Sequence, residues 1–200
     1  MPITSISQLD FNKIYTYADY LTWQFDEVVE LIKGRLYKMT PAPLSEHQRV
    51  SGNVFFYLFS YFKNKPCQLF DAPFDVRLPA KGAKDEDILN VFQPDICVIC
   101  DESKVDRRGC LGAPDLIVEI LSQSTAEKDL KIKYALYEEA GVQEYWIAIP
   151  QAKSIQHYHL QDGKYVLCGI LTESDTITSK LFPDLSIALK DVFEGIDKFL

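Results

Sequence analysis

Two short apolar segments, DLIVEIL at residues 115–121 and EYWIAI at residues 144–149, decide the fold. Each is almost wholly apolar, as is typical of strands that are covered on both faces. Between them, residues 124–140 follow a helical pattern that a Ser124 cap begins and Gly141 ends. A strand, a helix and a second strand in this order favour a right-handed crossover between parallel strands.

The remaining elements are expected on both sides of this unit. A further apolar strand is DICVIC, at residues 95–100, and a long helix covers Ser45 to Phe62, with Ser45 and Gln48 as a capping box. The other expected elements are a short helix at 16–24, an extended run broken by a turn at 28–40, a strand at 67–78, surface loops at 79–90 and 101–112, a hairpin of 154–160 with 164–168, and a short helix at 189–193. We predict an α/β fold with a mixed sheet flanked by helices and an additional C-terminal β-hairpin, in one domain over residues 1–200.

Composition bounds the class of protein. The chain has 200 residues, of which 47% are hydrophobic and 25% charged, which excludes wholesale disorder. No apolar stretch approaches the ~20 residues of a membrane helix, so no membrane association is expected. The N-terminus shows no export signal, which favours a cytoplasmic location. The five cysteines are therefore expected to be free thiols.

The charge balance limits how the chain could bind nucleic acid. Asp and Glu number 29 against 21 Lys and Arg, for a net charge of −8. Such a chain binds polyanions poorly, unless a local basic patch or a metal on clustered carboxylates offsets the charge. The candidate basic patch consists of Lys104, Arg107 and Arg108.

Glu119 is the first ionisable residue inside an apolar pattern. It lies within the strand LIVEIL, where burial of an unpaired carboxylate costs several kcal/mol or forces its protonation. Asp115 lies on the same face of the strand, four residues earlier, which makes it a supporting candidate. A cation opposite Glu119 would explain the burial, and that cation could be a metal ion or a structural Lys or Arg.

Asp95 and Lys133 complete the candidate site. Asp95 follows Pro94 at the start of the neighbouring strand. The alternative interpretation is that its carboxylate only accepts hydrogen bonds from local backbone groups. Lys133 interrupts the inward stripe of the helix at 124–140. An ion pair with Asp129, or extension of the lysine into solvent, would explain Lys133 equally well. The two carboxylates can hold Mg²⁺ or Mn²⁺, and the ammonium group can orient a water or stabilise the phosphate, which is the chemistry of phosphodiester hydrolysis.

An ordered series of motifs carries a resemblance to a known family. The motifs are ELIKGRL (30–36), PLSEH (43–47), QPDI (93–96), GAPDLIVEILS (112–122), Ser124-Thr125, Asp129, Lys133, Tyr137, Gly141-Val142 and EYWI (144–147). The chain resembles the Uma2-like, or DUF820, group of restriction-endonuclease-type proteins in the PD-(D/E)XK nuclease superfamily. The resemblance covers about residues 26–150 and implies the nuclease fold.

The resemblance also implies roles for single residues. Asp95 and Glu119 would be the metal-binding catalytic acids, and Glu30 and His47 would support them. The superfamily's lysine normally follows the Glu by two residues, where this chain has Leu121; Lys133 occupies the position that this group uses instead. DNA is the implied substrate, and a homodimer is expected because two sites cut two strands. The chain departs from the family pattern at Gln123 and Ile149.

Other readings stay open at this point. A non-catalytic binding or regulatory module with the same fold, and a hydrolase of a smaller phosphate ester, are both compatible with the sequence. Cys97 and Cys100 do not suggest a zinc site, because positions three apart on a strand face opposite sides. His157 and His159 are expected to be exposed to solvent, and the aromatic segment at 54–62 is expected to be core or dimer interface.

Overall fold

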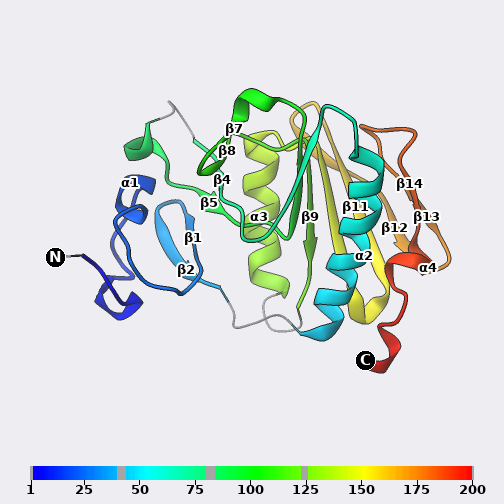
Figure 1. Ribbon diagram of the computed structural model, residues 1–200, viewed down its shortest axis with the longest axis horizontal. Coiled ribbons are helices and arrows are strands. Elements are labelled where there is room, and N and C mark those ends of the chain that lie inside the picture. The colour runs from blue at the N-terminus through cyan, green and yellow to red at the C-terminus, as the bar shows by residue number, and fades with distance from the viewer. Residues whose placement is uncertain (1, 40–43, 80–83, 123–125, 200) are drawn as a thin grey trace.

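A mixed six-stranded sheet forms the centre of the computed structural model, which describes residues 2–39, 44–79, 84–122 and 126–199 (Figure 1). In spatial order its strands are β12 (Lys164–Thr172), β11 (Ser154–Gln161), β10 (Glu144–Ile149), β9 (Leu116–Ile120), β6 (Ile96–Ile99) and β3 (Gln68–Asp71). β9 and β10 are parallel, and the helix α3 (Ala126–Ala140) connects them. All other neighbours in this sheet are antiparallel. The predicted parallel pair and the C-terminal hairpin are confirmed.

The two faces of this sheet are covered by different layers. In the central strands β6, β9 and β10, even-numbered side chains such as Val118 and Trp146 pack with the long helix α2 (Ser45–Phe62) and the C-terminal segment. The odd-numbered side chains of these three strands, such as Ile117 and Tyr145, pack with α3 and the second sheet. Because side chains alternate along a strand, Glu119 shares the face of Ile117 and points toward α3.

A second six-stranded sheet lies beside α3. Its strands, in spatial order, are β2 (Arg35–Lys38), β1 (Val29–Ile32), β5 (Val91–Phe92), β4 (Val76–Arg77), β8 (Gly109–Leu111) and β7 (Val105–Asp106). Two predictions are wrong here. The expected strand at 67–78 divides into β3 and β4, which belong to different sheets, and the expected loop at 101–112 contains β7 and β8. A Cβ at Gly109 would collide with the backbone oxygen of Asp75, so glycine permits this close approach of β8 to the chain before β4.

The C-terminal segment is fastened to β10 by a buried polar cluster. The C-terminal segment contains β13 (Thr176–Thr178), β14 (Ser186–Ala188) and the helix α4 (Leu189–Val192). The fully buried carboxylate of Glu144 lies 2.7 Å from Nε2 of His157 and accepts a hydrogen bond of 2.7 Å from the hydroxyl of Ser179. His157 is therefore buried and paired, and the expectation that it is exposed is wrong.

The helix ends differ from the prediction at two places. Leu44 caps α2 without a side-chain hydrogen bond, so the predicted capping box of Ser45 and Gln48 is wrong. The expected helix at 16–24 is the single turn α1 (Tyr17–Tyr20), which Thr16 and Asp19 cap. The predicted Ser124 cap of α3 lies outside the described residues. The remaining short turns are 3₁₀ segments at Ile6–Gln8, Asp85–Asp87, Glu102–Lys104, Pro150–Ala152 and Asp197–Phe199.

Two of the five cysteines are bonded to each other. A disulfide joins Cys67, just before β3, to Cys100, just after β6. The expectation that all thiols are free is therefore wrong for this pair, whose strands β3 and β6 are hydrogen-bonded neighbours. Cys97 and Cys110 are buried free thiols, and Cys168 is exposed. Among the described helices, no helix has the length and apolar character to cross a membrane.

Two glycines in or near helices should respond oppositely to substitution. Gly141 ends α3 with a φ of +88°, whereas Gly52 lies inside α2 with ordinary helical geometry; an added Cβ would meet nothing within 4 Å at either position. We expect Gly141→Ala to lower the free energy of unfolding by about 1 kcal/mol through backbone strain. We expect Gly52→Ala to raise it by about 0.5–1 kcal/mol. Urea unfolding of both variants measures the difference, and shifts of equal sign would contradict the assignment.

Candidate active site

The two predicted acids face each other across an antiparallel strand pair. Ile96 of β6 is paired with Val118 of β9, so the next pair outward is Asp95 with Glu119. Oδ2 of Asp95 accepts a hydrogen bond of 2.7 Å from the backbone N–H of Ile120, which fixes the carboxylate beside the end of β9. The pairing of two strands thus brings together residues that are 24 positions apart in the sequence.

Lys133 reaches the same place from α3. Its Nζ lies 3.0 Å from Oε1 of Glu119 and 3.1 Å from Oε1 of Glu30, on β1 of the second sheet. Only 9% of Lys133 is exposed, so the lysine points inward as the helical stripe predicted. Tyr137 lies one turn further along α3, and its hydroxyl donates a hydrogen bond of 2.8 Å to the same oxygen of Glu119.

His47 approaches from α2 on the other side of the acids. Its Nε2 lies 3.3 Å from Oδ1 of Asp95. Burial acts to lower the pKa of His47, but the hydrogen bond to Asp95 and the charges of Asp95 and Glu119 outweigh it and raise that pKa above its ordinary value. Nδ1 of His47 is buried and has no hydrogen-bond partner within the described part of the chain.

Negative charge exceeds positive charge in this cluster. The carboxylates of Glu30, Asp95 and Glu119 face one ammonium group and one imidazole. Burial, reinforced by the charges of Asp95 and Glu30 and opposed by Lys133, raises the pKa of Glu119 from 4.5 to about 7. Burial opposes the charged form of Lys133 as well, but the two glutamates raise the pKa of Lys133 above its ordinary value, so the lysine stays protonated.

The donor set suits a hard divalent cation. Mg²⁺ and Mn²⁺ prefer carboxylate oxygens and usually retain several water ligands, so two acids suffice to hold one ion. Asp95 and Glu119 supply such oxygens, and a buried carboxylate of raised pKa gains most from a cation. Within the described residues, no three His, Cys, Asp or Glu side chains already form a metal-binding group. An ion here would depend on two protein ligands and on water.

Asp115 is not brought into the site. It shares the face of Glu119, but it lies at the opposite end of β9, about 13 Å away along the strand. Its Oδ2 accepts a hydrogen bond of 2.7 Å from the backbone N–H of Cys100. This contact orients the end of β6, so the residue has a structural role in place of the supporting role expected from the sequence.

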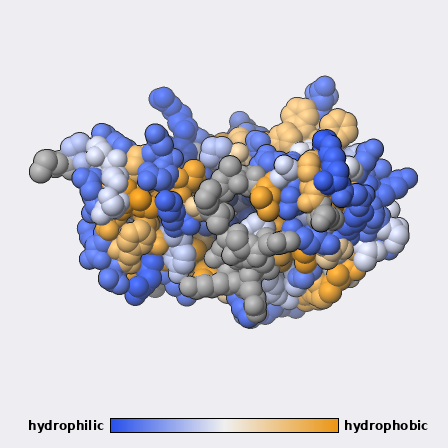
Figure 2. Space-filling view, turned by 90° about the horizontal axis from the view of Figure 1, so that it is seen from below, coloured by the Kyte–Doolittle hydropathy of each residue, from blue (hydrophilic) through white to orange (hydrophobic). Residues whose placement is uncertain are grey.

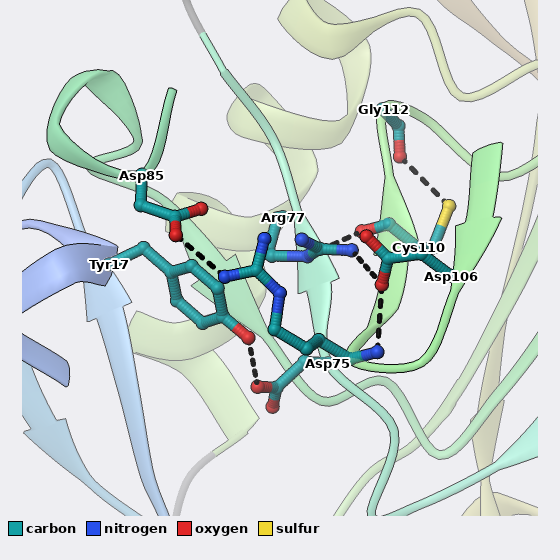
Figure 3. A network of polar contacts seen from close by, with 8 residues as sticks. Tyr17, Asp75, Arg77, Asp85, Asp106, Cys110 and Gly112 are labelled. Carbon is teal, nitrogen blue, oxygen red and sulfur yellow. Dashed lines mark hydrogen bonds and ion pairs between the residues drawn. The ribbon is translucent and has the colours of Figure 1, made fainter. Parts of the chain in front are cut away.

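The polar residues behind Glu30 were not predicted. The backbone N–H of Gln93 donates to Oε1 of Glu30 at 3.1 Å, and the Gln93 amide donates to Asp75 at 2.8 Å. Asp75 also accepts a hydrogen bond from the Tyr17 hydroxyl at 3.4 Å (Figure 3). These contacts hold Glu30 against Lys133. The only sequence signal was the position of Gln93 in the motif QPDI.

The proposed basic patch is largely engaged in contacts with the protein itself. Arg108 pairs with Asp85 at 2.6 Å in the same network as the buried Arg77 (Figure 3). Nζ of Lys104 donates to the backbone oxygen of Ala113 at 2.9 Å. These side chains brace β7 and β8, and the patch offers less positive charge to a polyanion than the sequence suggested.

Two acids on an antiparallel strand pair, an amine from the following helix and a mixed sheet with helices on its faces define a restriction-endonuclease-like nuclease fold. The sequence profile of the Uma2 family, described as "Putative restriction endonuclease", matches residues 17–190, and the chain belongs to this family. Membership of this family supports a nuclease function.

Two similar proteins accompany the family match. The crystal structure of a putative nuclease belonging to DUF820 from Anabaena variabilis superposes with a TM-score of 0.66. It is 20% identical, and the match covers 89% of this chain and 97% of that one. The uncharacterized protein sll1609 of Synechocystis sp. is 26% identical over 171 residues, which are 82% of this chain and 92% of that protein.

The raised pKa values predict that the metal-free protein loses stability as pH rises. Between pH 4.5 and about 7 the folded state keeps a proton on Glu119 that the unfolded state has lost. The raised pKa of His47 acts in the same direction, because its stabilising charge is lost as pH increases. We expect the free energy of unfolding in EDTA to fall by a few kcal/mol over this window. In Glu119→Gln the fall should shrink to the His47 contribution, and an unchanged slope would contradict the burial argument.

Removal of the ammonium group should destabilise the fold strongly. In Lys133→Met, Glu30 and Glu119 would be left buried without their shared cation, at a cost of about 3–5 kcal/mol near pH 7. Addition of Glu119→Gln should recover part of the loss. Lys164→Met is the control, since Lys164 pairs with Glu138 on the surface. A loss below about 1 kcal/mol, the value for an exposed pair, would show that Lys133 is not held between the glutamates.

Proposed function

We propose that the protein is a metal-dependent endonuclease that hydrolyses DNA phosphodiester bonds at the Asp95–Glu119 pair. The observation that carries the proposal is the meeting of three carboxylates at the end of the β6–β9 pair. Glu30 and Glu119 are buried and share Lys133, and the mostly buried Asp95 contacts His47. Such an excess of buried negative charge is costly unless a cation is bound there in the working state. The family assignment supports a phosphodiester as the substrate.

Each side chain then has a separate role. Asp95 and Glu119 would hold Mg²⁺ or Mn²⁺, which lowers the pKa of bound water and offsets charge on the phosphoryl group. Lys133 would orient the attacking water or stabilise the phosphate oxygens, from its place beside Glu119. Tyr137 and Glu30 would restrict Glu119 and Lys133 to one orientation. His47 would orient Asp95 through its Nε2.

A catalytically degenerate module is the competing function. It is favoured by the two ion pairs of Lys133, which would leave this lysine less free to act on a substrate. Titration with Mg²⁺ or Mn²⁺ in a calorimeter separates the two. A nuclease should bind one ion through Asp95 and Glu119, with binding lost in Glu119→Gln, whereas a degenerate site should bind neither ion measurably.

The cleavage assay tests the proposed roles directly. Plasmid DNA is incubated with Mg²⁺ or Mn²⁺ and with wild type, Glu119→Gln, Asp95→Asn or Asp115→Asn. We expect the first two variants to lose at least about 100-fold in rate, since loss of a charge-stabilising group costs about 2.7–4 kcal/mol of barrier. Asp115→Asn, the matched carboxylate outside the site, should retain most activity if folded. Equal rates for wild type and Glu119→Gln would reject the proposal.

A homodimer remains part of the proposal, because two sites are needed to cut two strands in one binding event. Of the aromatic segment at 54–62, Val54, Leu58 and Phe62 are core, but Phe56 and Phe59 are 61% and 50% exposed. The exposed pair offers apolar contact area to a second copy. Light scattering of wild type and Phe56→Ser measures the oligomeric state. A wild type that is monomeric at all concentrations would reject the homodimer.

A further inference from the structure

A cavity lies beside the first turns of α2, on the side of the helix away from the core. Its volume is about 480 Å³, and its lining consists of Ser45, Gln48, Arg49, Gly52, Asn53 and Phe199. Val50 and Val54, on the opposite side of the helix, are buried in the core. The cavity is therefore separate from the Asp95–Glu119 pair, although His47 belongs to the same first turns of α2.

The cavity and the candidate active site lie toward the same end of the molecule. The N-terminal end of α2, the final turn of the chain and the carboxyl end of β9 all lie at the lower edge of the ribbon (Figure 1). Viewed from that edge, the surface mixes hydrophilic and hydrophobic residues, and no continuous apolar face covers it (Figure 2). A ligand along this edge could touch α2 on both sides.

The lining has the chemistry of an anion site. It offers the Ser45 hydroxyl, the Gln48 carboxamide and the Arg49 guanidinium group, whereas the Asn53 amide already donates to backbone oxygens of the C-terminal segment. Among the described residues, the lining includes no carboxylate. Arg49 forms no ion pair with any of the residues that the structure describes. The nearby carboxylate of Asp197 is turned to Lys153, at 2.6 Å. In a chain of net charge −8, a cavity whose described lining has no carboxylate differs from the average surface.

Gly52 adds an independent observation. It is an exposed glycine in the middle of an α-helix, where it costs about 0.5–1 kcal/mol relative to alanine. An added Cβ would meet nothing within 4 Å, so packing among the described residues gives no reason for glycine here. A glycine that the fold does not need, in the wall of a polar cavity, suits the close approach of a ligand to the helix backbone.

We propose that this cavity binds the sugar–phosphate backbone of DNA, at a phosphodiester near the one that is cut. Arg49 neutralises the phosphate, Ser45 and Gln48 donate hydrogen bonds to its oxygens, and Gly52 leaves room for the backbone. Phe199 gives the sugar an apolar surface. This inference rests on the proposed nuclease function, because it names DNA as the ligand.

A charge placed at Gly52 tests the proposal without disturbing the fold. Gly52→Glu and Gly52→Gln put side chains of equal size in the open space, and only one is charged. A fluorescein-labelled DNA duplex is titrated in Ca²⁺, which takes the same oxygen ligands as Mg²⁺, and fluorescence anisotropy gives the affinity. We expect Gly52→Glu to bind about 10-fold more weakly than Gly52→Gln, a difference of about 1.4 kcal/mol. Equal affinities would overturn the proposal.

The salt dependence of binding provides a second measurement. Arg49→Ala should reduce the slope of log affinity against log salt by about 0.9, the value for one lost phosphate contact. Lys63→Ala is the matched control, because it removes another exposed charge from the far end of α2, about 21 Å away along the axis. A change of slope that is the same in both variants would also overturn the assignment.

Failure of the cavity proposal and failure of the nuclease proposal give different results. If Gly52→Glu and Gly52→Gln bind equally while Glu119→Gln abolishes cleavage, the cavity proposal is wrong and the nuclease stands. If the charge at Gly52 weakens binding but wild type cuts no DNA, the cavity stands and the nuclease proposal fails. If wild type binds no duplex at all, the cavity proposal is rejected.

Discussion

The ammonium group of Lys133, held between Glu119 and Glu30, is the contact on which the arrangement of the molecule depends. Glu119 belongs to the central sheet, Glu30 to the second sheet and Lys133 to the helix between them. One buried charge therefore links three layers. Buried ion pairs contribute little net stability, but they penalise strongly any packing in which a partner is missing. The same contact that sets the position of the layers also orients a proposed metal ligand.

The sequence predicted the strands and helices that have a clear local pattern of apolar residues. The apolar segments at 115–121 and 144–149 became the parallel pair β9 and β10, because both strands are covered on both faces and read as apolar runs. Of the second sheet, the extended run broken by a turn at 28–40 was predicted and is the β1–β2 hairpin. The rest of that sheet was missed, because β4 and β5 contain two residues each and show no periodicity. Such short strands exist only through their partners, which the sequence does not indicate.

The same distinction explains the success and failure at single residues. Glu119 and Lys133 were recognisable because a charge in an apolar pattern requires a partner. Tyr137 lies in the same helical stripe, but an aromatic residue there looks like ordinary core, and its hydroxyl contact involves another element. His157 looked exposed because its partner, Glu144, lies on the neighbouring strand. Asp115 was correctly placed on the face of β9 that carries Glu119. The side-chain alternation that places it there does not show that the candidate site lies at the other end of the strand.

Because Glu30 comes from the second sheet, the ion pairs of Lys133 are complete only after both sheets have formed. Synthesis produces β1 first and α3 much later, and the strands between them must pair before Lys133 can meet both glutamates. A nascent chain, or a fragment cut by a protease between the sheets, holds only part of this constellation. If the protein cleaves DNA as proposed, the activity arises only after the whole chain has folded, so incomplete chains do not cut DNA.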